Sequence, residues 1–250
     1  MKSVSDLKVK IFGDGADIAG ILELSRKPYI KGFTTNPTLM RKAGIPDYAA
    51  FAAQVLQQIT DRPVSFEVLA DDAETMERQA RHVATWGKNV YVKIPVTNTR
   101  RAPMYELIRR LSHEGIQLNV TAILTLEQVR ETANALHGGA PSNVSVFAGR
   151  IADTGRDPVP LMKECVDMLA KNEHCELIWA SPRELLNIFQ ADEIGCDIIT
   201  VTNDILKKLD LVGKRLEDFS LETVKMFYED GLKSGYTLEP DSARAAKKSI

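Results

Sequence analysis

Short apolar runs recur at regular intervals along the chain, and each is followed by a longer stretch with helical spacing. The runs are rich in valine and isoleucine, which favour strands, and they occupy residues 9–13, 30–34, 64–68, 90–94, 117–122, 144–147, 176–180 and 197–201. Residues 47–60 illustrate the stretches between them, because Tyr48, Phe51, Val55 and Ile59 lie three or four residues apart. The alternation predicts eight strands with helices between them.

Further helices are predicted at residues 74–86, 103–114 and 158–171, the last of which opens on a proline. Strands that alternate with helices imply right-handed crossovers and a mostly parallel sheet. Eight such strands in 250 residues favour an α/β fold of the closed (β/α)8 TIM-barrel type over an open doubly wound sheet. Residues 221–232 have one more apolar face, which predicts an extra C-terminal helix that packs on the barrel.

The composition is that of an ordinary globular protein and contains no linker that would divide it. We therefore expect one domain over residues 1–250, with a polar and basic tail at 240–250 that is mobile. The formal net charge of -2 argues against a nucleic-acid partner. There is no apolar run of about 18 residues, and no secretory signal is evident at the start. We expect a cytoplasmic protein with no membrane partner.

The cysteines and histidines are spaced too irregularly for a disulfide framework or a metal site. No cysteine pair has CxxC spacing, and the four histidines lie far apart. The cysteines, which we expect to be reduced thiols, are Cys165, Cys175 and Cys196. We expect neither a metal nor a cofactor.

In barrels of this type the chemistry collects at the C-terminal ends of the strands. The polar residues predicted there are Asp14, Thr35, Asn36, Glu67, Lys93, Asn119, Thr121, Ser145, Arg150, Ser181 and Arg183. Each has an ordinary explanation when taken alone, such as a turn, a helix cap or a surface ion pair. Their convergence on one barrel mouth exceeds what packing requires, and it predicts an active site.

Lys93 stands out because it interrupts the apolar run at residues 90–96. An ammonium ion among apolar side chains is costly, so burial favours the neutral amine. A neutral lysine is a nucleophile that can form a Schiff base with a carbonyl substrate. Alternatively, the amine reaches water or pairs with a carboxylate such as that of Glu67. Both interpretations remain open on this residue alone.

Six segments at the predicted strand ends form a consistent set of motifs. They are TTNPTL at residues 34–39, SFEV at 65–68, KIP at 93–95, NVT at 119–121, SVFAGRI at 145–151 and ASPR at 180–183. Together they resemble the transaldolase family of class I aldolases, in order, from about residue 10 to residue 202. The resemblance implies a barrel enzyme without a cofactor that acts on sugar phosphates in the pentose phosphate pathway. A homo-oligomer is compatible with it.

The resemblance also implies a role for each residue. Lys93 would attack the C2 carbonyl of sedoheptulose 7-phosphate or fructose 6-phosphate, and Asp14 would take the C4 hydroxyl proton. Glu67 and Thr121 would position a water molecule for proton transfer. Asn36 and Asn119 would hold the retained three-carbon unit, and the phosphate would bind Arg150, Ser181 and Arg183. The full set of implied substrate-binding residues is Thr35, Asn36, Asn119, Ser145, Phe147, Arg150, Ser181 and Arg183.

Two activities share this lysine in the family. Transaldolases transfer the dihydroxyacetone unit to an aldose phosphate, whereas fructose 6-phosphate aldolases release it. The aldolase branch typically has glutamine at the position of Glu67 and tyrosine at that of Phe147, so the resemblance favours a transaldolase. A non-catalytic barrel that binds sugar phosphates is a third hypothesis, and the presence of Lys93 and Asp14 speaks against it. The C-terminal helix and Pro182 depart from the family pattern and leave the preferred acceptor open.

Overall fold

The computed structural model describes residues 3–236 and 238 of the chain. Contacts divide the chain into two units, one that ends at Asp210 and one that begins at Leu211. Each unit is described by itself below. The tail predicted to be mobile, at residues 240–250, lies outside the described residues.

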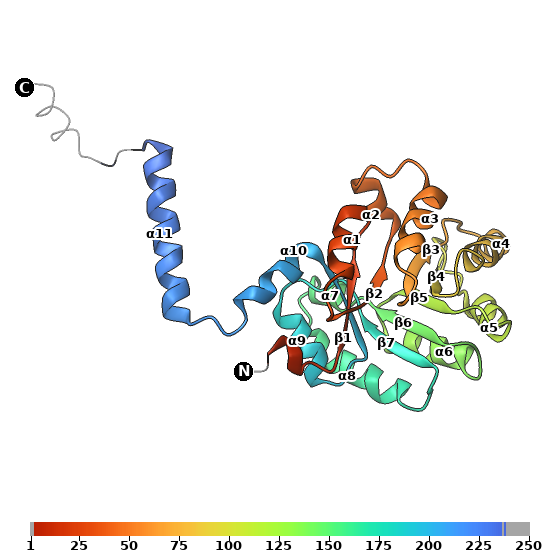
Figure 1. The fold of residues 1–250 in the computed structure, drawn as a ribbon. Helices are drawn as coiled ribbons and strands as arrows, with labels where there is room; N and C mark the ends of the chain where they lie inside the picture. The colour runs from red at the N-terminus through yellow and green to blue at the C-terminus, as the bar shows by residue number, and fades with distance from the viewer. Residues whose placement is uncertain (1–2, 237, 239–250) are drawn as a thin grey trace, which may run out of the picture. The chain divides into compact units, whose positions relative to one another are not determined.

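The first unit is a closed barrel of eight parallel strands in sequential order (Figure 1). Each strand pairs with the one before it, and the last pairs with the first. The strands are β1 (Lys10–Asp14), β2 (Ile30–Thr34), β3 (Val64–Glu67), β4 (Val90–Pro95), β5 (Leu118–Ile123), β6 (Ser142–Val146), β7 (Cys175–Trp179) and β8 (Ile198–Thr202). The predicted α/β fold of the (β/α)8 TIM-barrel type is therefore confirmed, and the predicted strand limits agree with these within two residues.

Helices surround the strands, and most of them begin at a polar residue that caps the first turn. The side chains of Asp47 and Asp72, for example, accept hydrogen bonds from the backbone N–H groups three residues ahead. The barrel helices are α1 (Ile18–Ser25), α2 (Pro37–Lys42), α3 (Tyr48–Gln58), α4 (Ala73–Ala84), α5 (Tyr105–His113), α6 (Leu126–Leu136), α7 (Ala148–Ala152), α8 (Pro158–Leu169), α9 (Leu186–Glu193) and α10 (Asn203–Leu206). Short 3-10 helices span residues 4–6 and 207–211.

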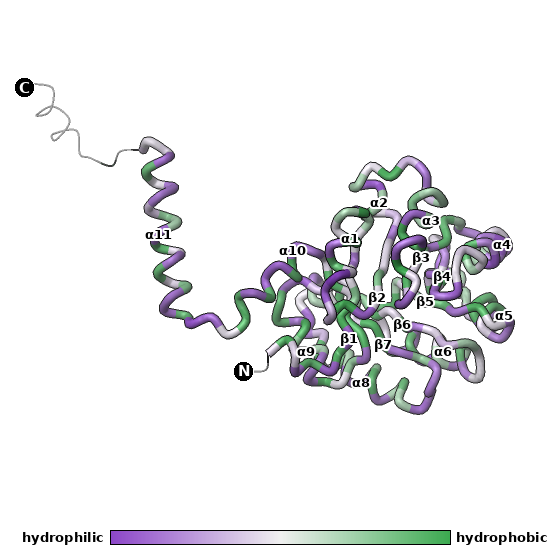
Figure 2. Tube along the Cα trace, in the orientation of Figure 1, coloured by the Kyte–Doolittle hydropathy of each residue, from purple (hydrophilic) through white to green (hydrophobic). Residues whose placement is uncertain are grey.

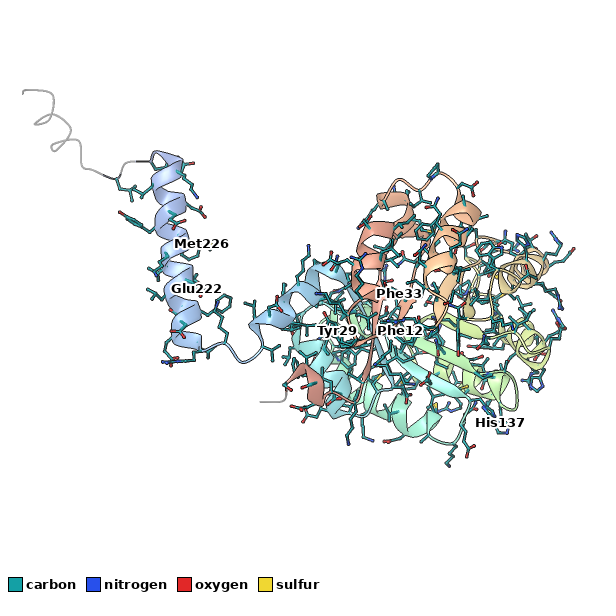
Figure 3. All side chains as sticks on the ribbon, in the orientation of Figure 1. Phe12, Tyr29, Phe33, His137, Glu222 and Met226 are labelled. Carbon is teal, nitrogen blue, oxygen red and sulfur yellow. The ribbon has the colours of Figure 1, made fainter. Side chains whose placement is uncertain are left out.

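Apolar side chains form most of the buried core, but the strands also bury polar residues such as Ser65, Asn119 and Asn143. Hydrophobic positions gather along the strands, whereas α4 is largely hydrophilic (Figure 2). Phe12 and Phe33, on neighbouring strands, are both buried (Figure 3). Phe12 also packs in one cluster with Ile178 and Ile198 from the opposite side of the closure. Burying one such side chain contributes about 1.5–3 kcal/mol, which favours the closed barrel.

The second unit contains helix α11 (Leu216–Ser234), which is longer than the predicted helix at residues 221–232. It ends at Gly235, whose φ of 67° suits a residue without a Cβ atom. Among the described residues, no helix combines the length and apolar character that crossing a bilayer requires. That α11 packs on the barrel, and that residues 1–250 form one domain, both stay predictions.

Candidate active site

A cavity of about 630 Å³ opens at the C-terminal ends of the strands. It is lined by every predicted site residue except Thr35, namely Asp14, Asn36, Glu67, Lys93, Asn119, Thr121, Ser145, Phe147, Arg150, Ser181 and Arg183. The strand register accounts for the convergence, because Glu67 lies opposite Lys93, and Lys93 lies opposite Asn119. Residues that are 26 positions apart in the chain thereby become neighbours on one barrel wall.

Lys93 points into this cavity from β4 and is only 6% exposed. Its Nζ atom donates a hydrogen bond to the Thr35 carbonyl oxygen at 2.9 Å and lies 3.2 Å from Glu67 Oε2. The amine is thus buried, paired with a carboxylate and aimed into a cavity at the same time. Both interpretations of this lysine describe part of the observed geometry.

Thr35 contributes its backbone rather than its side chain. Its hydroxyl is fully buried and donates to the Ser65 carbonyl oxygen at 2.9 Å. Its own carbonyl oxygen accepts the hydrogen bond from Lys93. The structure therefore places Thr35 behind the amine and away from the cavity surface.

Asp14 ends β1 and is partly buried beside two threonines. The Thr34 hydroxyl donates to Asp14 Oδ1 at 2.8 Å and is also hydrogen-bonded to the Thr200 hydroxyl. Burial raises the pKa of Asp14 above its ordinary value, while the charge of Lys93 and the hydrogen bond from Thr34 oppose that rise. Asp14 is thus placed to exchange a proton near the Lys93 amine.

Polar side chains from β3, β5 and β6 form a hydrogen-bonded row among the site residues. Asn119 Nδ2 donates to the Ser65 hydroxyl at 3.0 Å, and the Ser145 hydroxyl donates to Asn119 Oδ1 at 2.7 Å. These bonds fix the orientation of the Asn119 amide, which keeps one further donor and one further acceptor position. Asn36 caps α2 by accepting from the Leu39 N–H at 2.9 Å, so the helix-cap interpretation and the cavity position both hold for it.

Thr121 lies next to an irregularity in β5. The pairing of β5 with β6 shifts register between Val120 and Ile123, and Ala122 in this segment has a φ of 63°. Such bulges re-aim side chains and are frequent beside active sites. The Thr121 hydroxyl is buried and makes no hydrogen bond within the described part of the chain, although it belongs to a residue that lines the cavity.

Two arginines line the opposite part of the cavity. Arg183 donates from Nε to Asp153 Oδ1 at 2.8 Å and from Nη1 to the Ser181 hydroxyl at 3.1 Å. The guanidinium group of Arg150 lies 5.9 Å from the centre of the Phe147 ring. The surface ion pair considered for Arg183 therefore exists, and it orients the side chain within the cavity lining.

Ser181 adopts a left-handed conformation, with a φ of 61°, immediately before Pro182. This backbone is unfavourable for serine, so neighbouring structure has to hold it in place. Gly149 packs closely against it: a Cβ atom added there would lie 1.5 Å from the Ser181 carbonyl oxygen. The arginine side of the cavity thus depends on a glycine that the sequence motif did not explain.

Several residues near the site were missed by sequence reasoning. Asp153 orients Arg183 but lies just past α7, away from the strand ends. Thr34 and Lys42 line the cavity, yet Thr34 reads as the last strand residue and Lys42 as a surface lysine. Tyr48 has the spacing of an apolar helix face, which predicts packing alone, although its hydroxyl group contacts the Glu67 backbone. Of these residues, only Thr34 could have been found from the sequence, because it is the first residue of the TTNPTL motif.

With this geometry established, comparison with known proteins identifies the family. The family model described as "Transaldolase/Fructose-6-phosphate aldolase" matches residues 11–239. The chain belongs to the transaldolase/fructose-6-phosphate aldolase family. Two relatives named "Probable transaldolase" are each 36% identical: that of Dehalococcoides mccartyi over 80% of this chain and 90% of its own, and that of Thermoanaerobacter sp. over 91% and 99%.

A solved structure supports the fold independently of sequence. The protein named KGPDC from Streptococcus mutans superimposes with a TM-score of 0.54, covering 80% of this chain and 90% of its own. Its sequence identity of 11% carries no information about the reaction. The relatives and the family model together make this protein an enzyme of the transaldolase/fructose-6-phosphate aldolase family.

Proposed function

We propose that this enzyme is a transaldolase that moves a dihydroxyacetone unit from a ketose phosphate to an aldose phosphate. The ketose phosphate is sedoheptulose 7-phosphate or fructose 6-phosphate, as in the pentose phosphate pathway of the cytoplasm. The observation that carries the proposal is the Lys93 amine, which is buried in a cavity with a carboxylate oxygen at 3.2 Å. A ligand-binding barrel without catalysis needs neither this amine nor Asp14.

In the first half-reaction, the neutral Lys93 amine attacks C2 of the ketose, and loss of water gives a protonated imine. Asp14 takes the proton of the C4 hydroxyl group while the electrons of the C3–C4 bond move into the imine. The aldose phosphate leaves, and an enamine of dihydroxyacetone remains on Lys93. The enamine then attacks the acceptor aldehyde, Asp14 returns its proton, and hydrolysis of the imine restores the amine.

Imine formation and hydrolysis also move protons to and from water. The Glu67 carboxylate is close enough to the amine to exchange those protons, and the buried Thr121 hydroxyl is free to hold the water involved. Asn36 and Asn119, which both line the cavity, would bind the hydroxyl groups of the retained three carbons. These roles use donors and acceptors that the protein leaves partly unfilled.

The phosphate would bind on the arginine side of the cavity, at Arg150, Ser181 and Arg183. Guanidinium groups suit a phosphate because their N–H groups match its oxygens. Binding energy from this remote group orients the C3–C4 bond against Lys93 and Asp14. The Asp153 carboxylate holds Arg183 in place before the substrate arrives.

The second candidate is an aldolase that releases free dihydroxyacetone. It differs from a transaldolase in how readily water reaches the bound enamine. Phe147 contributes a ring without a hydroxyl group to the cavity lining and contacts Arg150, so it adds no proton donor near the enamine. Together with Glu67, it favours transfer over release.

Borohydride reduction tests the central step. Reduction in the presence of fructose 6-phosphate should leave a dihydroxyacetone-sized adduct on Lys93, detected by intact-mass and peptide mass spectrometry. No adduct, or an adduct on another lysine, would remove the assignment. Release of glyceraldehyde 3-phosphate from fructose 6-phosphate should then require erythrose 4-phosphate as acceptor. Release at the same rate with and without the acceptor would identify the aldolase instead.

A further inference from the structure

The backbone of Glu67 is held by a side chain from a helix. The Glu67 N–H donates to the Tyr48 hydroxyl oxygen at 2.6 Å, and the same hydroxyl donates to the Glu67 carbonyl oxygen at 3.0 Å. Tyr48 is the first residue of α3, whose N-terminus is fixed by the Asp47 cap. One phenol group therefore satisfies both main-chain groups at the point where β3 ends.

This contact replaces a bond that the sheet would otherwise make. Thr35 N–H donates to the Ser65 carbonyl at 3.1 Å, and in a parallel ladder the Thr35 carbonyl would next accept from the Glu67 N–H. The Glu67 N–H donates to Tyr48 instead. The Thr35 carbonyl oxygen accepts from Lys93 Nζ at 2.9 Å in its place. The Thr35 carbonyl oxygen, which is left without a partner in the sheet, thus accepts the hydrogen bond of the lysine amine.

The Tyr48 ring is fixed by its neighbours. It packs edge-on against Phe66, with centroids 6.2 Å apart, and against Trp86, at 5.6 Å. Burial raises the pKa of Tyr48 above its ordinary value, so the phenol keeps the proton that it donates. Its hydroxyl group is consequently held at one place beside β3.

We infer that Tyr48 is a positioning residue for imine chemistry: its hydroxyl holds Glu67 in place and leaves the Thr35 carbonyl to the Lys93 amine. This inference rests on the proposed function of Lys93 and Glu67. Without the hydroxyl, the Glu67 N–H would be an unpaired donor whose nearest ladder partner is the Thr35 carbonyl. Lys93 would then have to share that carbonyl, and the Glu67 carboxylate would lose its fixed distance from the amine.

The test is Tyr48→Phe in the full chain, which keeps the aromatic packing and removes only the hydroxyl. We expect imine formation, measured by timed borohydride quenching with fructose 6-phosphate, to slow by about tenfold or more, as loss of well-placed proton transfer does. KM for the ketose phosphate should change by less than about twofold, because the arginine side is untouched. Thermal unfolding of the variant establishes that it is folded.

Tyr29→Phe is the matched control. Tyr29 precedes β2, at the end of the barrel opposite the cavity, and is labelled in Figure 3. Its variant should form the imine at the wild-type rate. A slow Tyr48→Phe with a normal Tyr29→Phe supports the inference.

A double-mutant cycle with Glu67→Gln distinguishes positioning from general weakening. If Tyr48 acts through Glu67, the double variant should be slowed by less than the product of the two single losses. Losses that multiply, or a Tyr48→Phe variant with the wild-type imine rate, overturn the inference while the adduct on wild-type Lys93 upholds the proposed function. A wild-type protein without that adduct overturns both.

Discussion

Replacing Thr34 with valine is expected to move the acid limb of the kcat/KM profile to higher pH. The Thr34 hydroxyl is buried and donates to Asp14 Oδ1 at 2.8 Å, so it favours the carboxylate over the carboxylic acid. Without that donor, the pKa of Asp14, already raised by burial, rises further. At a given acidic pH, fewer molecules then hold the carboxylate that takes the C4 hydroxyl proton in the proposed mechanism, and activity falls there first.

The size of the shift follows from the hydrogen bond. A hydrogen bond to a charged group contributes about 1.5–3 kcal/mol, and one pKa unit corresponds to about 1.4 kcal/mol, which gives about one to two units. Asp14 lines an open cavity, so water replaces part of the lost donor. We therefore expect about one unit. Valine keeps the branched shape of threonine but replaces its hydroxyl with a methyl group, so Thr200 also loses a hydrogen-bond partner.

The assay measures release of glyceraldehyde 3-phosphate with excess erythrose 4-phosphate, from about pH 5 to pH 9, where the free enzyme's acid limb is visible in kcat/KM. Thr200→Val is the control, because Thr200 contacts the Thr34 hydroxyl rather than Asp14 in the hydrogen-bond chain. It should shift the limb in the same direction by less than half as much. At high pH the Thr34→Val rate should return toward that of the wild type. An unmoved limb, or one at lower pH, would refute the reasoning.

Three further outcomes are expected. Asp14→Asn should still give the borohydride adduct but cleave the C3–C4 bond about a hundredfold or more slowly, and failure to form any imine would contradict its assigned role. Gly149→Ala should raise KM for phosphorylated donors about tenfold or more by displacing Ser181, whereas adduct formation with free dihydroxyacetone should persist. The three cysteines are buried, with pKa values raised to about 12, so thiol reagents at pH 8 should label them only after unfolding.

The barrel was predictable because its strands are buried on both faces. Runs such as residues 90–94 are almost wholly apolar, and parallel strands between helices require that pattern. The alternation with helices then fixes the strand order, since crossovers are right-handed and sequential neighbours pair. The placement of α11 was not predictable in this way, because an apolar helix face does not specify the surface that covers it.

The site was predictable where a side chain at a strand end lines the cavity. Lys93, Glu67 and Asp14 could be found by listing polar residues at those ends. Contacts made by backbone groups could not be found, because any residue type can supply a carbonyl. Thr35 was predicted among the substrate-binding residues, and the hydrogen bond from Lys93 to its carbonyl oxygen could not be foreseen. The contact of Tyr48 with Glu67 was not predictable for a related reason: the helical spacing of Tyr48 is the same whether or not its hydroxyl group makes a hydrogen bond.

Under the proposed function, the distribution of charge in the cavity favours one orientation of a sugar phosphate. Asp14 and Glu67 flank the lysine amine, and a phosphate dianion near them would meet two carboxylates. Arg150 lies among the lining residues and forms no ion pair within the described chain, so its charge is available to an anion. In the proposed reaction, the phosphate end of the substrate would therefore lie toward the arginines and its carbonyl end toward Lys93. A donor with a second phosphate beside its carbonyl would place that group against the carboxylates, and we expect it to be excluded.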